Sequence, residues 1–493
     1  MVEINGNLTI EDVISVAHGE PVSLGDQARE RMRRSREVVE RIIRAGRPVY
    51  GINTGVGRLA EVRIDDDQLA QLQVNIVRSH AVGVGDPFPK EVVRAMMLLR
   101  ANTLALGYSG VRPVVVETLI DMLNHDIVPV VPSRGSVGAS GDLAPLAHIA
   151  LSLIGEGEVY YRGQRLPAYY AMKMESIEPV QLAAKEGLAV INGTQASTAL
   201  LSIALRRAFN LFHSANVTAA MTFEATNGVA EEFIDEIGQI RPHSGIAEVL
   251  REFRRLIEGS QLTGGEKVRV QDAYSIRCVP QVHGAVYDVL QFVKSIVETE
   301  INSVTDNPVV FPDGRVVSNG NFHGQHVAFA ADSLAASITT LGSISERRTF
   351  RLLDRELSGL PAFLVEQGGL NSGLMMLQVT QAALVSENKS LAHPASVDSI
   401  PTSADQEDYV SMSMTAALKA MQVVENTEKV VAIELIAALQ ALDFRGVDKT
   451  SPILQQIHRA ARKEIPYIAS DRVYQSDIQK ALEFITKTLP EMV

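Results

Sequence analysis

The sequence predicts a mainly α-helical protein, an elongated helical bundle with a few short β-hairpins. Apolar residues recur at spacings of three and four residues in two long segments, which begin near Val327 and Met414. We expect helices of about 30 residues there, well above the mean of roughly 11 to 12 for globular proteins. Aromatic residues make up only 5% of the 493-residue chain and tryptophan is absent, so we also expect a largely aliphatic core.

The first strong helical pattern covers residues 27–45. Apolar residues such as Val38 and Ile42 share one face of it, and Gly46 is a typical helix stop. The following segment, 49–57, has three glycines within seven positions, a composition that favours a tight irregular loop over a helix or a strand.

The densest motif is GSVGASGDLAPLAH, residues 135–148. Its small residues, up to Gly141, allow backbone conformations that a Cβ atom would forbid. Asp142 is then expected to cap a helix that has Pro145 in its first turn, where a missing N–H costs little. Taken alone, this pattern is that of a glycine-rich turn entering a helix.

Two hairpins and the two long helices complete the prediction. The hairpins join 159–161 to 164–166 through Arg162-Gly163, and 309–311 to 316–317 through 312–315. The second long helix should end at Gly446, and the chain returns to amphipathic helix after Ser451. The apolar seams consist of Val327, Ala331, Leu334, Ile338 and Leu341 in the first long helix, and Met414, Leu418, Met421, Val431, Leu435, Leu439 and Leu442 in the second.

No internal repeat or Pro/Gly/Ser-rich linker marks a domain boundary. We expect two domains: residues 1–200, which carry the glycine-rich motif and loop, and residues 201–493, which form the long-helix bundle. Helices of this kind often bury their seams against copies of the same chain. The second domain is therefore expected to make a homo-oligomer.

Charge and composition argue against several classes of protein. The chain has 46 basic and 58 acidic residues, a formal net charge of −12, so it lacks the basic field that nucleic-acid binding needs. We find no signal-peptide pattern and no uninterrupted apolar stretch of ~20 residues, and expect no membrane span. The single cysteine, Cys278, cannot form an internal disulfide, which fits a reducing compartment and predicts a cytoplasmic protein.

Seven motifs in the expected order resemble those of the aromatic amino acid ammonia-lyases and aminomutases, and together they cover nearly the whole chain. They are YGINTG (50–55), SHAVGVG (79–85), GSVGASGDLAPL (135–146), INGTQ (191–195), QDAYSIRC (271–278), NFH (321–323) and QED (406–408). The resemblance implies the helical fold of the fumarase/aspartase-like superfold. It also implies a homotetramer whose sites combine residues from several subunits.

The resemblance further implies a prosthetic group made from the chain itself. In this family the segment that matches Ala139, Ser140 and Gly141 cyclises to methylideneimidazolone (MIO). The glycine nitrogen attacks the alanine carbonyl carbon, two waters are lost, and the serine leaves an electrophilic methylene. No external cofactor is then needed. A tight, glycine-rich turn is the physical requirement for this attack, and this segment can meet it.

Elimination of ammonia from an α-amino acid needs a base, an activated amine and a clamp for the carboxylate. By resemblance Tyr50 is the base, although a free phenol has a pKa of about 10, so the site must lower the pKa or hold the phenolate. Arg277 resembles the carboxylate clamp, a task that suits a bidentate guanidinium. The remaining residues implied are Asn192 and Tyr274, which assist at the electrophile and the substrate amine, and Gln271 and Phe322, which bind substrate.

Two residues bear on the substrate, a small amino acid. His80 and Glu407 resemble the residues that hold the imidazole in histidine-specific members of the family. A buried carboxylate can accept a hydrogen bond from an imidazole N–H but would be unpaired against a phenyl ring. The expected reaction is therefore non-oxidative elimination of ammonia from L-histidine to give trans-urocanate, the first step of histidine degradation.

Three alternatives remain open. Asp405 and Tyr409 depart from the histidine-specific pattern, so a tyrosine or phenylalanine ammonia-lyase, or a tyrosine 2,3-aminomutase with the same electrophile, fits as well. A helical scaffold without activity is the third, although its expected mark, a broken Ala-Ser-Gly motif, is missing. We expect no metal site, because His323 and His326 have no further ligand at a suitable spacing.

Overall fold

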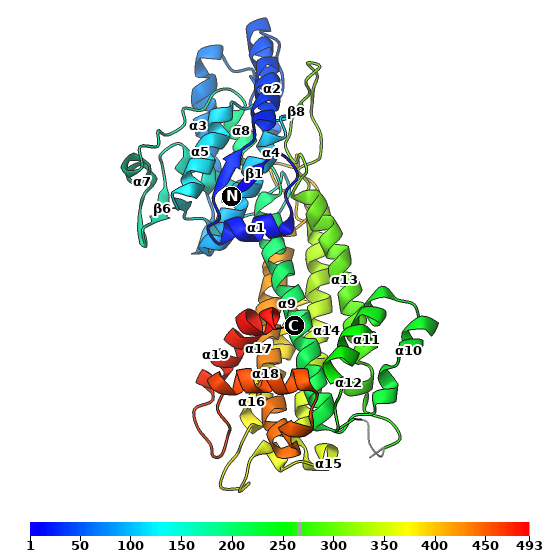
Figure 1. The fold of residues 1–493 in the computed structure, drawn as a ribbon. Helices are drawn as coiled ribbons and strands as arrows, with labels where there is room; N and C mark the ends of the chain where they lie inside the picture. The colour runs from blue at the N-terminus through cyan, green and yellow to red at the C-terminus, as the bar shows by residue number, and fades with distance from the viewer. Residues whose placement is uncertain (264–268, 493) are drawn as a thin grey trace. The chain divides into compact units, whose positions relative to one another are not determined.

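The computed structural model describes residues 1–263 and 269–492, and it confirms a mainly α-helical protein with a few short strands (Figure 1). The chain forms two compact units. The first comprises Met1–Ile203, Lys294–Asp332 and Pro394–Leu418, and the second comprises Ala204–Val293, Ser333–His393 and Lys419–Val493. The domain boundary predicted between residues 200 and 201 stays a prediction.

The first unit contains helices of ordinary length and several two- and three-stranded sheets. Its helices are α1 (Ile10–Ala17), α2 (Asp26–Ala45), α3 (Leu69–His80), α4 (Lys90–Ala105), α5 (Pro113–Asn124), α6 (Leu143–Leu153), α7 (Ala168–Met174) and α8 (Glu186–Ile191). Helix α4 is buried along almost its whole length and packs against α1 and α5. Helices α3, α6 and α8 pack against one another, so segments far apart in the sequence meet there.

Both predicted hairpins form. Strands β6 (Glu158–Tyr161) and β7 (Gln164–Pro167) pair around Arg162 and Gly163, both of which have positive φ, and β8 (Val309–Val310) pairs with β9 (Val316–Val317). Three further strand pairings were not predicted. These are parallel β1 (Val2–Ile4) with β2 (Val22–Leu24), antiparallel β3 (Val84–Pro87) with β5 (Pro132–Arg134), and β4 (Val128–Pro129) with β6. Such short strands have too few residues to show an alternation.

Four of the five points at which the chain passes from one unit to the other lie within long helices, and the fifth lies between His393 and Pro394. The four helices are α9 (Gln195–Ala225), α13 (Val279–Glu300), α14 (Gln325–Leu353) and α17 (Ser413–Arg445). The predicted long helices correspond to α14 and α17, and α17 ends directly before Gly446 as expected. Helix α14 is long and apolar enough to cross a membrane, but 67% of its most apolar window is buried inside the protein. Burial of this kind is typical of a core helix.

The second unit also contains shorter helices, α10 (Asp235–Ile240), α11 (Ser244–Ile257), α12 (Tyr274–Arg277), α15 (Arg355–Ser358), α16 (Met375–Leu391), α18 (Pro452–Glu464) and α19 (Gln475–Glu483). Its core is not wholly aliphatic. Phe223, Phe233 and Phe253 are fully buried, and the rings of Phe233 and Phe253 stack with centroids 4.2 Å apart. A low overall aromatic content therefore did not prevent a local aromatic cluster.

Helix α2 anchors the glycine-rich loop. It ends as predicted at Gly46, whose φ of 65° is left-handed. Its apolar face, with Val38 and Ile42, packs against Ile52 of the loop and Val310 of β8. This contact fixes the loop that carries Tyr50.

Candidate active site

Five of the predicted site residues line one cavity of about 780 Å³ in the first unit. Their positions follow from the packing of α3, α6 and α8, because His80 ends α3, Ser140 lies just before α6, and Asn192 follows α8. The glycine-rich loop and the segment before α17 add the others. The full lining is Tyr50, Gly55, Val56, Gly57, Arg58, Leu59, Val62, Ile64, Leu72, Asn75, Ile76, Ser79, His80, Ser140, Leu143, Leu188, Asn192, Asn307, Ser403, Ala404 and Glu407.

The Ala139-Ser140-Gly141 segment is held tightly on both sides. Gly141 has a φ of 71°, and a Cβ atom there would lie 2.2 Å from the carbonyl oxygen of Gly193. The Asn192 side chain donates to the Ser140 carbonyl oxygen over 3.0 Å, whereas its own Oδ1 is buried with no partner among the described residues. The close packing of the Gly141 backbone fits the implied MIO ring, and so does the Asn192 oxygen, which is placed near Ser140 as a hydrogen-bond acceptor.

The other side of the segment is clamped by residues that precede and begin α17. The Met412 N–H donates to the Val137 carbonyl over 2.8 Å, and Ser411 Oγ donates to the Gly138 carbonyl over 3.0 Å. Gly138 is also left-handed, with a φ of 68°, and a Cβ atom there would collide with Ser411 and Ser413. Residues 138–141 are therefore closely packed in a tight turn, as the implied cyclisation would require.

Asp142 stands at the N-cap position of α6 as expected, but its side chain makes no capping hydrogen bond there, so that part of the expectation was wrong. Its carboxylate accepts hydrogen bonds from the N–H and Oγ of Ser197, over 2.7 and 2.8 Å, in the first turn of α9. It also accepts from Ser136 over 2.7 Å. Burial raises the pKa of Asp142, and these donors oppose the rise. Asp142 therefore ties the Ala139-Ser140-Gly141 segment to the start of α9.

Tyr50 lies half-buried in the glycine-rich loop. The loop is shaped by the Asn53 side chain, which accepts from the Val49 N–H and donates to a backbone carbonyl. Burial is the main cause of a raised pKa at Tyr50, and the charges of Glu407 and Asp306 raise this pKa further. The Gly57 N–H, 3.4 Å from the phenol oxygen, lowers it. Within the first unit the net effect is therefore a raised pKa of Tyr50, whereas a phenol that acts as a base needs a lowered pKa.

His80 and Glu407 present polar groups to the same cavity. Nδ1 of His80 donates to the Ile76 carbonyl over 2.7 Å, so in the neutral ring Nε2 is the acceptor. One carboxylate oxygen of Glu407 accepts from Ser140 Oγ over 2.9 Å. The structure therefore brings the residue expected to select the substrate into contact with the residue expected to form the electrophile.

The other predicted residues lie elsewhere. Ala139 and Gly141 are buried beside Ser140 and do not line the cavity, and neither does Phe322, which lies in the first unit before α14. Gln271, Tyr274 and Arg277 belong to the second unit.

There Tyr274 is 72% exposed and the Arg277 guanidinium lies over its ring, 4.7 Å from the centroid. Nε of Arg277 is buried without a partner among the described residues. The roles assigned to these residues stay predictions.

Sequence reasoning missed Thr402 and Ser403, whose hydroxyls contact Glu407, and Asn307, which lines the cavity. No motif contains these residues. Their proximity to the QED motif was the one available indication for the first two.

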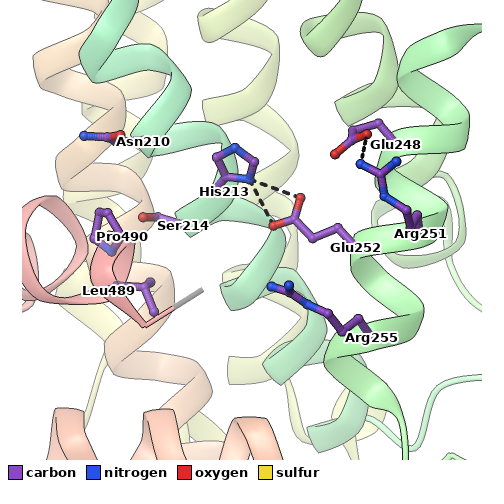
Figure 2. A pocket seen from close by; sticks show the side chains of 9 residues that line it. All are labelled: Asn210, His213, Ser214, Glu248, Arg251, Glu252, Arg255, Leu489 and Pro490. Atoms are coloured by element: carbon purple, nitrogen blue, oxygen red, sulfur yellow. Dashed lines mark hydrogen bonds and ion pairs between the residues drawn. The ribbon is translucent and has the colours of Figure 1, made fainter. Parts of the chain in front are cut away.

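A second cavity, of about 490 Å³, lies in the second unit (Figure 2). Nδ1 of His213 on α9 is 3.1 Å from Glu252 on α11, and Glu248 forms an ion pair with Arg251. Its lining is Asn210, His213, Ser214, Glu248, Arg251, Glu252, Arg255, Leu489 and Pro490. None of the predicted site residues is among them, so the cavity around Ser140 is the candidate active site.

Comparison with known proteins identifies the family. A family profile for aromatic amino acid lyases matches residues 8–463. The chain is 54% identical to the curated histidine ammonia-lyase of Geobacillus thermodenitrificans over 484 residues, which is 97% of this chain and 96% of the relative.

Solved structures are similar over the full length. The histidine ammonia-lyase of Trypanosoma cruzi matches with a TM-score of 0.93 and 42% identity, over 100% of this chain and 95% of its own. The tyrosine aminomutase of Streptomyces globisporus matches with a TM-score of 0.94 and 38% identity, over 99% and 97%. These likenesses confirm the predicted helical superfold and a carbon–nitrogen lyase. The chain belongs to the aromatic amino acid lyase family.

Proposed function

We propose that this chain is a histidine ammonia-lyase, which eliminates ammonia from L-histidine to give trans-urocanate in the first step of histidine degradation. The observation that carries the proposal is the Glu407 carboxylate, 2.9 Å from Ser140 Oγ in a cavity that His80 also lines. A carboxylate in this position suits an imidazole N–H and would be desolvated without a partner against a phenyl ring. The curated relative named above supports the same substrate.

We propose that Ala139, Ser140 and Gly141 form the MIO ring in the mature protein. When present, this group supplies an electrophilic carbon for the substrate amine and makes the nitrogen a good leaving group. The left-handed Gly141 supports this proposal, and so does Oδ1 of Asn192, which has no partner in the described part of the chain. No external cofactor is required.

The remaining work falls to side chains of the cavity. Tyr50 removes the β-proton, while Asn192 holds the residue 140 carbonyl and offers Oδ1 to an ammonium or amide hydrogen. His80 accepts at Nε2, and Glu407 accepts at the oxygen that faces Ser140. Together they orient the imidazole in its cationic form, which has one N–H for each acceptor. A closely held substrate keeps the β-proton within reach of the phenol oxygen.

We further propose a cytoplasmic homotetramer in which Tyr274 and Arg277 of a neighbouring copy complete each site. Tyr274 is exposed with the Arg277 guanidinium stacked on its ring, and no described residue bonds to Nε of Arg277; both observations suit groups that a neighbouring copy completes. A cation near Tyr50 would counter the rise in its pKa. Arg277 of the neighbouring copy would then both bind the substrate carboxylate and help to ionise Tyr50.

The first test combines product formation with intact mass. We expect near-ultraviolet absorbance to rise, and ammonia to appear, with L-histidine and not with L-tyrosine or L-phenylalanine. The purified chain should be lighter than its sequence by two waters, and Ser140→Ala should abolish both the loss of water and the turnover while the helical content is retained. Turnover of tyrosine alone, or turnover by Ser140→Ala, would contradict the proposal.

The second test concerns the choice of substrate. We expect Glu407→Gln to reduce kcat/KM for histidine by about 10- to 100-fold, since hydrogen bonds to charged groups contribute about 1.5 to 3 kcal/mol. Trace activity on phenylalanine should fall much less, because its phenyl ring has no hydrogen-bond donor to pair with the carboxylate. An equal loss on both substrates would remove Glu407 from the explanation of selectivity.

A further inference from the structure

The loop that carries Glu407 is closed by its own backbone. Thr402 and Glu407 form an isolated antiparallel bridge, with N–H to carbonyl distances of 3.0 and 3.3 Å. Between them, Ser403, Ala404 and Asp405 have φ values of 52°, 52° and 63°. Three successive non-glycine residues in the left-handed region are unfavourable, so the surrounding contacts must determine this turn.

The two carboxylate oxygens of Glu407 have different hydrogen-bond partners. Oε2 accepts from Thr402 Oγ1 over 2.6 Å and from Ser403 Oγ over 2.9 Å. Oε1 accepts from Ser140 Oγ over 2.9 Å. Thr402 is half-buried, whereas Ser403 is exposed, so the threonine makes the better protected of the two bonds.

We propose that Thr402 is a positioning residue for Glu407, an inference that rests on the proposed function. Ring formation removes the Ser140 hydroxyl as water, so Oε1 loses its donor while Oε2 keeps both of its own. The oxygen that faces residue 140 then becomes the acceptor for the imidazole N–H of the substrate. Thr402 holds the carboxylate so that this oxygen, and not Oε2, points into the cavity.

The left-handed turn brings the side chain of Thr402 next to the Glu407 carboxylate. The reversal over residues 403–405 returns the chain so that the residue 402 hydroxyl and the residue 407 carboxylate lie on the same side of the bridge. An ordinary extended segment would place residues five apart well beyond hydrogen-bond reach. The strain of the turn is therefore linked to the placement of a single carboxylate.

The test compares Thr402→Val, which keeps the shape and removes the hydroxyl, with Thr402→Ser, which keeps the hydroxyl. We expect kcat/KM for L-histidine to fall about 10-fold in Thr402→Val and to be largely rescued in Thr402→Ser. Thr118→Val is the matched control, because that hydroxyl donates to the Val114 carbonyl of its own helix, far from Glu407 in the sequence. Both valine variants should still lose two waters.

Two further measurements separate positioning from a structural role. In a Glu407→Ala background, Thr402→Val should have no further effect on kcat/KM, since the group it acts on is gone. In a Ser140→Ala background, which cannot form the ring, calorimetry should show that Thr402→Val weakens L-histidine binding about 10-fold.

The outcomes are distinct. If the unmodified chain releases no ammonia from L-histidine, the proposed function is wrong and the inference falls with it. If the unmodified chain is active but Thr402→Val matches it, or if the effects of Thr402→Val and Glu407→Ala add independently, the proposed function stands and the inference is overturned.

Discussion

At the scale of single residues, Tyr50 is proposed as the base although its surroundings in the first unit raise its pKa. Burial is the main cause, and Glu407 and Asp306 add to it. Because the base must lose its proton before it can act, activity should rise with pH until the phenol ionises. The charge of Glu407 thus has two effects, since the carboxylate that suits the substrate also works against the base.

We expect Tyr50→Phe to lower kcat/KM by about 10²- to 10⁴-fold, the usual contribution of a positioned base. The variant should still lose two waters, and its residual rate should no longer increase with pH. Tyr160→Phe on the β6 strand is the control and should match the unmodified chain. A pH–rate profile of the three proteins makes the comparison, and near-normal turnover in Tyr50→Phe would exclude it as the base.

Much of the cavity could be predicted from sequence because its residues lie in distinctive motifs. His80, Asn192 and Glu407 were predicted in this way, and the structure places them around one cavity with Ser140. Thr402 could not be predicted, because its contact with Glu407 depends on three left-handed residues that are neither glycine nor asparagine. Backbone conformations of that kind leave little trace in the sequence.

At the scale of elements, two glycines meet where the cyclising segment passes the end of α8. Gly141 forms a backbone bridge with Gly193, and the Asp142 N–H donates to the Gly193 carbonyl over 2.7 Å. No side chain fits between the two segments. Residue 141 is therefore restricted to glycine for two reasons: its φ is left-handed, and the Gly193 backbone leaves no room for a Cβ atom.

We expect Gly141→Ala to block maturation. The new Cβ would lie 2.2 Å from the Gly193 oxygen, so the segment must shift, and intact mass should show no loss of water. Gly163→Ala in the β6–β7 turn is the control, since it has a φ of 76° but no atom within 4 Å of the new Cβ. It should lose about 1 to 2 kcal/mol of stability and remain active. A mature Gly141→Ala protein would contradict this account.

The element-scale predictions succeeded where a pattern was long. Helices α2, α14 and α17 were predicted from apolar spacing and glycine stops, and the turn at Arg162 and Gly163 fixed one hairpin. The Asp142 side chain was expected to cap α6, but it accepts hydrogen bonds from the first turn of α9. Its sequence position beside α6 gave no sign that α9 begins within reach of its carboxylate. The spacing of apolar residues along the sequence could not predict contacts between distant segments.

At the scale of the whole molecule, buried carboxyl groups link stability to pH. Burial raises the pKa of Glu224 on α9 to about 8, although the Ser451 N–H donates to it. The folded protein therefore keeps this proton up to about pH 8, whereas the unfolded chain loses it near its ordinary pKa of about 4.3. Because the folded state binds more protons in this window, stability falls as pH rises from about 4.3 through 8.

We expect Glu224→Gln to remove this dependence. Its unfolding midpoint should be close to that of the unmodified chain near pH 5 and several degrees higher near pH 9, since the amide keeps an acceptor and carries no charge. Glu37→Gln, exposed on α2, is the control. Thermal unfolding at a series of pH values provides the measurement, and parallel curves for all three proteins would show that Glu224 does not contribute.

The clamp on the cyclising segment has a consequence for the timing of synthesis. Ser140 leaves the ribosome long before Ser411 and Met412, which hold residues 137 and 138. At about 5 to 20 residues per second, the interval is roughly 15 to 50 s. During that interval the nascent chain carries Ala139, Ser140 and Gly141 without their clamp, so we expect no cyclisation before residues 411 and 412 have been synthesised.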